Sequence, residues 1–373
     1  MRKFALFYRP IPGILLMLAI AILARGGADL GLPWWPGIEA YFAASAIMKR
    51  ILIDILHLNY ILISIILGML LANILGIPRW AASGVATSRL FIKIGVVLLG
   101  SLYSVMDLAR LGGMAVAIIV GFIVLMLAFT LWLGKRVGME ESGAATLAAG
   151  TAICGVAAVV AVAPVVRAKN TDVIYSIAAI LAFGLASLFL FPVIGTLVGL
   201  SAHQFGVWAG TGILNSGQVL AVCLGFDPGN IAHVSESLKT GEIYNLTRVI
   251  FLPFVVLFLA FSASRFASSE DDININTSLW SKFPLFVLGF LIVVFLTSFG
   301  LLGPTSPPSK ELTLIRNLYS WFFAIGLAGQ GMQISLSELR QAGGKTLMVG
   351  TAAGFFKALA ALAVVLLFVS QQP

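Results

Sequence analysis

The chain has 373 residues, of which 60% are hydrophobic and only 10% are charged, and its formal net charge is +8. A soluble globular domain is about half apolar and about one quarter charged, so this composition indicates an integral membrane protein and excludes a separate soluble domain. The excess of Lys and Arg fits side chains that flank membrane spans and meet anionic lipid. The sequence has no basic tract, and we expect the lipid bilayer as a partner and no nucleic acid.

Eleven apolar segments follow one another, most of them near the length of about 20 residues that crosses a bilayer. We therefore predict an all-α polytopic membrane protein with about 10–11 transmembrane helices, forming one domain over residues 1–373. The segments are residues 11–33, 59–77, 90–106, 113–134, 143–166, 173–200, 205–225, 243–263, 283–303, 315–334 and 346–369.

Two connections between these segments have a recognisable character. Glu39–His57 has apolar residues on one helical face and charged residues such as Lys49 and Arg50 on the other, which predicts an amphipathic helix in the membrane interface. Residues 264–282 include Glu270-Asp271-Asp272 and form the most polar loop. With the N-terminus taken as cytoplasmic, the loops carry 11 Lys and Arg inside and 9 outside, a slim preference for that orientation.

Two apolar stretches carry the same glycine-interrupted pattern. Ala149–Val162 and Ala209–Val222 share seven identities in fourteen positions without a gap. Glycine allows a helix to unwind, and paired broken helices of this kind form the binding sites of many secondary transporters. The offset of 60 residues makes the two copies parallel if the first copy spans the membrane, and inverted if it only re-enters. The sequence leaves both arrangements open.

A second repeat relates Phe91–Gly113 to Phe322–Gly344, with eight identities in twenty-three positions. Asp107 of the first copy aligns with Glu338 of the second. Seven predicted segments begin from the first copy up to the second, and an odd number of crossings makes the copies antiparallel. We therefore predict an inverted repeat with a two-fold axis in the membrane plane.

Three basic residues, Lys93, Arg248 and Lys357, lie within apolar segments, whereas all fifteen acids lie in loops or at segment ends. The sequence therefore shows no buried carboxylate that could carry protons or sodium. Each basic side chain either extends to the membrane surface or gives the interior a positive potential that favours an anion. We expect Lys357, the deepest of the three, to face the protein interior rather than lipid.

Polar side chains stand in and after the two broken stretches, where a plain membrane helix would have Leu. They either bind a solute together with backbone N–H groups at a half-helix N-terminus or are small residues that let helices pack closely. Gln330 and Gln333 form a third polar patch. The predicted substrate-binding residues are Thr151, Cys154, Gly155, Asn215, Ser216, Gln218, Arg248, Gln330 and Lys357.

No set of residues typical of an enzyme occurs in the sequence. It contains no Ser/His/Asp set, no phosphate-binding loop and no metal-ligand spacing, and Cys154 has no histidine in its segment to activate the thiol. We therefore expect no catalytic activity, no metal and no cofactor.

Four further motifs stand out in the sequence: Gly150–Pro164, Phe205–Thr211, Leu246–Arg248, and Gly343–Lys345 after Leu336–Arg340. At these motifs the chain resembles the bacterial putative sulfate exporter family, over most of residues 60–370. The resemblance implies a ten- or eleven-helix transporter in the bacterial plasma (inner) membrane and, more distantly, the crossed-broken-helix fold of bile acid symporters and sodium/proton antiporters. The family usually carries an acidic residue where this chain has Asn215, which puts proton coupling by that route in doubt.

The sequence as a whole favours a secondary transporter of a small anion, with sulfate or a sulfonate as the class implied by the resemblance. Two alternatives stay open: a passive anion channel, and a membrane receptor or scaffold with a transporter fold. The coupling ion (sodium or a proton), the direction of transport and a homodimeric state also stay open.

Overall fold

The computed structural model describes residues 9–55, 58–227, 235–266, 285–304, 308–337 and 344–369. Within these ranges the chain forms helices and no β-strand, which confirms the predicted all-α fold. Several further helices are apolar but shorter, such as Tyr60–Ile74. Five helical stretches are long and apolar enough to cross a membrane: Ala82–Leu102, Gly113–Val137, Asn170–Val198, Glu236–Ser262 and Gly344–Phe368.

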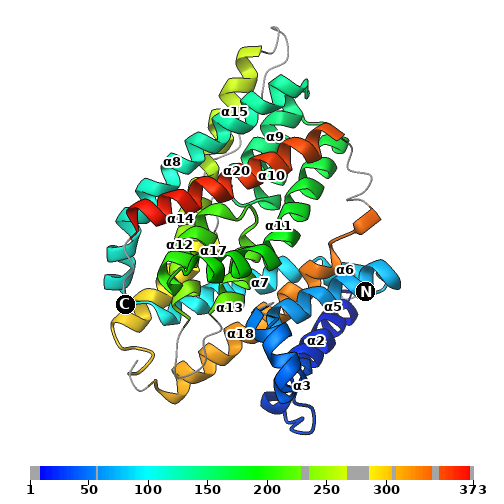
Figure 1. Ribbon diagram of the computed structural model, residues 1–373, viewed down its shortest axis with the longest axis vertical. Helices are drawn as coiled ribbons and strands as arrows, with labels where there is room; N and C mark the ends of the chain where they lie inside the picture. The colour runs from blue at the N-terminus through cyan, green and yellow to red at the C-terminus, as the bar shows by residue number, and fades with distance from the viewer. Residues whose placement is uncertain are drawn as a thin grey trace, which may run out of the picture.

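One group of helices surrounds α18 (Lys310–Met332), which packs against α2, α5 and α7 (Figure 1). Gly68 of α5 and Gly331 of α18 lie directly against carbonyl oxygens of the facing helix, because residues without a β-carbon allow two backbones to approach closely. The other members are α2 (Ile11–Arg25), α5 (Tyr60–Ile74), α6 (Ala82–Val85), α7 (Ser88–Leu99), η3 (Gly100–Leu102) and α17 (Leu285–Ser298).

The second group packs around α11 and α14 and contains the long helices α8 and α20, which cross the upper part of Figure 1. Both broken stretches belong to it. Its members are α8 (Val105–Val137), α9 (Glu141–Ala152), α10 (Val156–Val162), α11 (Asn170–Val198), α12 (Ala202–Gly212), α13 (Ser216–Phe226), α14 (Glu236–Ile250), α15 (Leu252–Phe266) and α20 (Gly344–Phe368).

The repeated segments α7 and α18 pack against each other antiparallel. Ser88 lies against Gly329, and Gly95, further along α7, lies against Phe323, which is earlier in α18. The contacts are also reciprocal, because Gly326, the repeat partner of Gly95, lies against Ile92, the repeat partner of Phe323. A two-fold axis between the helices produces such pairs. The predicted direction is therefore confirmed, and the alignment of Asp107 with Glu338 lies outside the described side chains.

The first broken stretch, α9–α10, is a re-entrant hairpin. Its first residue, Glu140, forms an ion pair of 2.6 Å with Lys169, which immediately precedes α11, and this hydrogen bond raises the pKa of the Lys169 ammonium group. Near the same end, Gly143 of α9 lies against Asp172 of α11. The chain therefore enters at Glu140, turns at Ile153–Gly155, and returns to the side from which it came.

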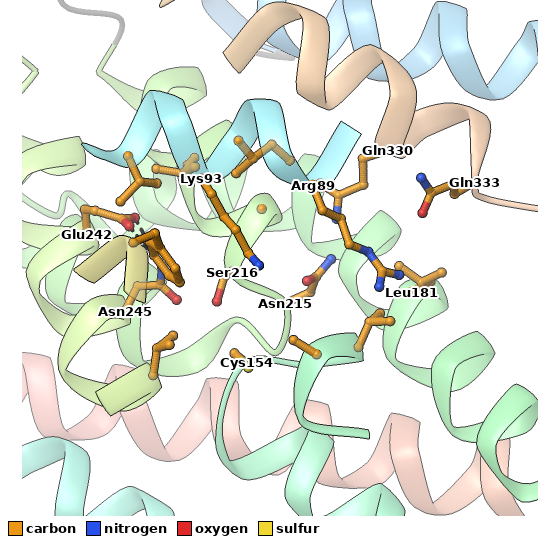
Figure 2. A pocket seen from close by; sticks show the side chains of 18 residues that line it. Arg89, Lys93, Cys154, Leu181, Asn215, Ser216, Glu242, Asn245, Gln330 and Gln333 are labelled. Carbon is orange, nitrogen blue, oxygen red and sulfur yellow. Dashed lines mark hydrogen bonds between the residues drawn. The ribbon is translucent and has the colours of Figure 1, made fainter. Parts of the chain in front are cut away.

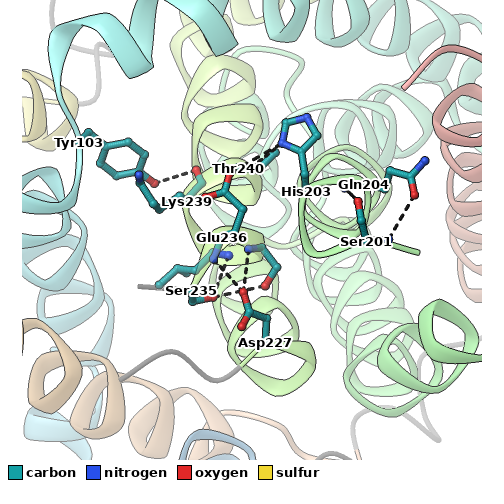
Figure 3. Close-up of polar contacts among 11 residues, drawn as sticks. Tyr103, Ser201, His203, Gln204, Asp227, Ser235, Glu236, Lys239 and Thr240 are labelled. Carbon is teal, nitrogen blue, oxygen red and sulfur yellow. Dashed lines mark hydrogen bonds and ion pairs between the residues drawn. The ribbon is translucent and has the colours of Figure 1, made fainter. Parts of the chain in front are cut away.

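The second broken stretch, α12–α13, is also a hairpin that returns to its starting side. Phe205 near its start stacks on Phe226 at its end, with ring centroids 3.8 Å apart. Figure 3 shows its base, where the ring of His203 lies 3.1 Å from the Thr240 hydroxyl of α14. Asp227, just after α13, accepts hydrogen bonds from the first N–H groups of α14. The two ends of this hairpin and the start of α14 therefore lie together.

Contacts along α11 show that the two hairpins enter from opposite ends. From its start toward its end, α11 meets the first hairpin at its base and then at its tip, and afterwards the second hairpin near its tip and then at its base. Gly155, at the tip of the first hairpin, lies beside Ile180 in the middle of α11. A β-carbon added at Gly155 would lie 3.0 Å from the α-carbon of Asn215, at the tip of the second hairpin. The tips therefore meet, as predicted, and the pair is inverted because each stretch re-enters.

Residues 143–166 and 205–225 are thus not transmembrane helices, which corrects two of the predicted spans. The antiparallel repeat nevertheless follows from the count, because removing two crossings leaves an odd number. The interfacial prediction for Glu39–His57 needs a second correction, since its described part forms three short pieces: α3 (Ile38–Ala44), α4 (Ala46–Met48) and η2 (Lys49–Ile55). The polar residues 270–272 lie outside the described part of the chain.

The hairpins also strengthen the expected orientation. Because each returns to its own side, Arg167 and Lys169 move to the side of the N-terminus, which then carries 13 of the Lys and Arg outside the predicted segments, against 7 opposite. We expect this side to be cytoplasmic. A membrane-impermeant maleimide should label Lys310→Cys in intact cells and Lys169→Cys only after permeabilisation, with both native cysteines buried. The reverse labelling pattern would contradict this orientation.

Candidate functional site

A cavity of about 130 Å³ lies where the hairpin tips meet the group of helices around α18 (Figure 2). Its walls come from both helix groups, and apolar residues such as Val96, Leu220 and Phe286 form much of them. Such a volume holds several water molecules or one small solute. Its polar lining residues are Arg89, Lys93, Cys154, Asn215, Ser216, Glu242, Asn245, Gln330 and Gln333.

The N-terminus of α13 opens onto this cavity. Asn215 precedes the helix, and Ser216 and Gly217 form its first turn, whose N–H groups have no partner within the helix. The Asn215 side chain is 6% exposed, and its amide nitrogen has no hydrogen-bond partner among the described residues. A buried donor without a partner is costly, so this amide is available for a bound solute.

Two cations on α7 face the same space. Arg89 and Lys93 lie one turn apart, and Figure 2 shows Lys93 ending near Asn215 and Ser216 at the tip of the second hairpin and Arg89 ending near Leu181 of α11. Both side chains are exposed, and in the described part of the chain neither forms a salt bridge. The Lys93 ammonium lies 5.8 Å from the ring centre of Phe286. Lys93 is therefore a lining residue of the cavity.

A polar ladder on α14 connects the cavity to the break in the second hairpin. The Asn245 amide donates to both oxygens of Glu242 at 3.2 Å, and its own oxygen accepts from Arg248 at 3.0 Å. Arg248 also donates to the carbonyl of Ile213 at 2.6 Å. Glu242 is fully buried and lines the cavity. The inference that no acid lies inside the membrane region is therefore wrong.

Lys357 faces the protein interior, as predicted, with no exposed surface. Its ammonium donates to the carbonyl of Thr151 at 2.8 Å, at the end of α9. In the same way, Arg248 donates a hydrogen bond to the carbonyl of Ile213, at the end of α12. The C-terminal end of a helix carries unsatisfied carbonyls and partial negative charge. Each buried cation therefore stabilises the end of the first helix of one hairpin, α9 or α12.

The structure brings some of the predicted substrate-binding residues together and separates others. Cys154, Asn215, Ser216 and Gln330 line the cavity. The others lie beside it: Thr151 bonds to Thr130, Gly155 forms the first tip, Gln218 packs against Gly184 of α11, and Arg248 and Lys357 bind carbonyls.

Sequence reasoning missed Arg89, Glu242 and Asn245. The predicted segments began at residues 90 and 243, which placed Arg89 and Glu242 in loops. The spacing of Glu242, Asn245 and Arg248 is the signal that was available, because polar residues three apart share one face of a helix. Among the described residues, no three His, Cys, Asp or Glu side chains gather as metal ligands would.

The contact between the tips can be tested at Gly155. Gly155 and Gly76 both have φ +74°, but an added β-carbon meets Asn215 and Ile180 at the first position and nothing at the second. Gly76→Ala should cost roughly 1–2 kcal/mol for its backbone alone. Gly155→Ala should cost more, because its backbone (φ +74°, ψ −123°) lies in a region that glycine alone adopts readily and because overpacking adds a further ~1–3 kcal/mol, seen as a lower melting temperature. Equal losses in the two variants would contradict the close contact.

Comparisons with known proteins agree with the membrane fold. The family model described as "Conserved hypothetical protein 698" matches residues 12–350. Two UPF0324 membrane proteins of Nitratidesulfovibrio vulgaris are 42% and 39% identical, covering 97% and 96% of this chain and 96% and 94% of their own. A UPF0324 membrane protein of Agrobacterium fabrum is 29% identical over 86% of this chain and 89% of its own. No solved structure matches the chain. The chain thus belongs to this family of bacterial membrane proteins.

Proposed function

We propose that the protein is a secondary transporter of a small anion, such as sulfate or a sulfonate, in the bacterial inner membrane. The observation that carries the proposal is the convergence of Arg89, Lys93 and the N-terminus of α13 on one cavity. Cationic side chains and helix N-termini both attract anions. The unpartnered amide of Asn215 adds a donor at the same point.

The position of the cavity favours a transporter over a membrane receptor or scaffold. It lies between two helix groups, next to hairpin tips that enter from opposite ends of α11. Access from either side could follow from movement of one group against the other, as in transporters built from broken helices and inverted repeats. The resemblance of Gly150–Pro164 to putative sulfate exporters supplies the substrate class.

The test is a thermal-shift screen of the purified protein with sulfate, short sulfonates and carboxylates, each with and without sodium. A ligand that binds only the folded state raises its melting temperature. Uptake into vesicles then separates the alternatives, because a transporter saturates and follows a driving ion, whereas a channel does neither. No shift with any anion, and no uptake, would overturn the proposal.

Asn215 provides the sharpest variant for this screen. Asn215→Ala should weaken anion binding by about 1–3 kcal/mol, because a donor in the cavity is lost. Asn215→Asp should weaken it further by placing a like charge beside the anion. Gln218→Met is a matched control, because Gln218 is also a buried, unpartnered amide but does not line the cavity. Weakening by the control and not by Asn215→Ala would place the site elsewhere.

A further inference from the structure

We propose that Glu242 takes up a proton when an anion binds, so that the protein moves its anion together with a proton. This inference rests on the proposed function and names its coupling ion and the residue that carries it. The observation behind it is a carboxyl group in the wall of a cavity whose other charged side chains are cations.

Glu242 has few partners for a buried acid. It has no exposed surface, and the Asn245 amide is its one hydrogen-bond donor among the described residues. No Lys, Arg or His of this part of the chain forms a salt bridge with it. One amide cannot fill the four acceptor sites of a carboxylate. The side chain is therefore free to change its protonation state without breaking an ion pair.

The charged and titratable groups around Glu242 come from several helices. Arg89 and Lys93 of α7 share its cavity, and Arg248 lies beyond Asn245 on its own helix. Two further neighbours are neutral at physiological pH in their ordinary state, namely the Tyr103 phenol and the Cys223 thiol of α13.

The remaining charged groups near Glu242 lie at the base of the second hairpin, and the other neighbouring helix segments carry no charged residue. Glu236 and Lys239 lie one to two turns earlier on α14, and His203 of α12 contacts Thr240 and Glu236. The membrane-spanning part of α8, residues 113–134, has no charged residue, and neither α10 nor α17 has one. Glu242 is thus the only carboxyl group that lines the cavity among the described residues.

An anion in this cavity meets Glu242 in one of two forms. A carboxylate repels the anion, whereas a protonated carboxyl group does not, and its O–H can donate a hydrogen bond toward the anion. Binding therefore favours the protonated form. By linkage, protonation must then strengthen anion binding to the same extent. The proton is supplied by water in the cavity, whose volume holds several water molecules.

The experiment is titration calorimetry of the full-length protein in detergent, with sulfate and methanesulfonate as probes. Measuring in two buffers of different ionisation heat counts the protons bound with each anion. We expect the number of protons bound per anion to rise from near zero at low pH, where Glu242 already holds its proton in the free protein, toward one at higher pH, where its carboxylate is ionised, and the apparent Kd to rise by up to about tenfold per pH unit over that higher range. Glu242→Gln should bind without proton uptake, with the parent's low-pH affinity at every pH. Glu141→Gln, an exposed acid outside the cavity, should behave like the parent.

The outcomes separate the two proposals. Anion binding in the parent without proton uptake at any pH overturns the coupling at Glu242 and leaves the anion site standing. Proton uptake that persists in Glu242→Gln also overturns it, because another group then carries the proton. If neither probe nor the wider screen of anions binds the parent at any pH, the proposed function fails and this inference fails with it. If Glu242→Gln does not fold, anion binding without proton uptake in the parent at every pH still overturns the coupling.

Discussion

Replacing Arg89 and Lys93 together by glutamine is expected to weaken anion binding about a hundredfold. Each side chain lines the cavity without an acidic partner in the described structure, so its charge is available to a bound anion. A hydrogen bond to a charged group contributes about 1.5–3 kcal/mol when it is buried. These side chains are exposed, so we expect about 1–2 kcal/mol, or roughly tenfold, from each.

The measurement is the Kd for sulfate or the anion that the thermal-shift screen selects, at low and at high salt. Lys135→Gln is the control, since Lys135 is an exposed cation at the far end of α8 and does not line the cavity. The melting temperature of the double variant should stay near that of the parent, because in the described structure neither side chain forms a salt bridge and Lys93 lies 5.8 Å from the centre of the Phe286 ring. Parent-like affinity in the double variant would remove the main argument for an anionic substrate.

The two buried cations are expected to respond to methionine in opposite directions. Arg248→Met leaves both the Ile213 carbonyl and the Asn245 side-chain oxygen without their donor, and should lower the free energy of unfolding by ~1–3 kcal/mol per orphaned acceptor. The Lys357 ammonium has three donors, but one acceptor, the Thr151 carbonyl, is its only partner within the described part of the chain. Lys357→Met also leaves the Thr151 carbonyl without this donor, at a cost of about 1–3 kcal/mol, but it removes a buried charge with no ionic partner among the described residues, whose desolvation cost is larger.

We therefore expect a lower melting temperature for Arg248→Met and an equal or higher one for Lys357→Met. Anion affinity should fall less in Lys357→Met than in the Arg89/Lys93 double variant, because Lys357 does not line the cavity. A large loss of affinity in Lys357→Met alone would show that its charge acts on the anion directly. Similar destabilisation by both variants would contradict the difference in their hydrogen bonding.

Some of the architecture follows from local pattern alone. The apolar segments predict a helical membrane protein because a bilayer requires each span to satisfy its own backbone hydrogen bonds. Gly155 marks the first break, because φ there is +74°, and Gly210, just before the second break, lies against the backbone of Gly241. The repeat that relates α7 to α18 is also visible in the sequence, because Gly95 and its repeat partner Gly326 make equivalent contacts with the facing helix.

Other features depend on pairs of residues that are distant in the sequence. That Ala149–Val162 re-enters is shown by the contacts of Glu140 and Gly143 with residues at the start of α11, which no local periodicity reveals. Hydropathy also treats a residue at a segment end as a loop residue, which hid Arg89 and Glu242 from the candidate site.

The sequence by itself determined the membrane fold, the positions of the two breaks and the presence of buried cations, because each of these depends on the composition of one segment. Only the tertiary structure decided what the cations hold and which side chains share the cavity. Lys357 and Arg248 bind carbonyls of the hairpins, whereas Arg89, Lys93 and Glu242 meet Asn215 across the two helix groups. A charge in a membrane interior takes its role from the partner it reaches, and that partner is set by packing between helices far apart in the chain.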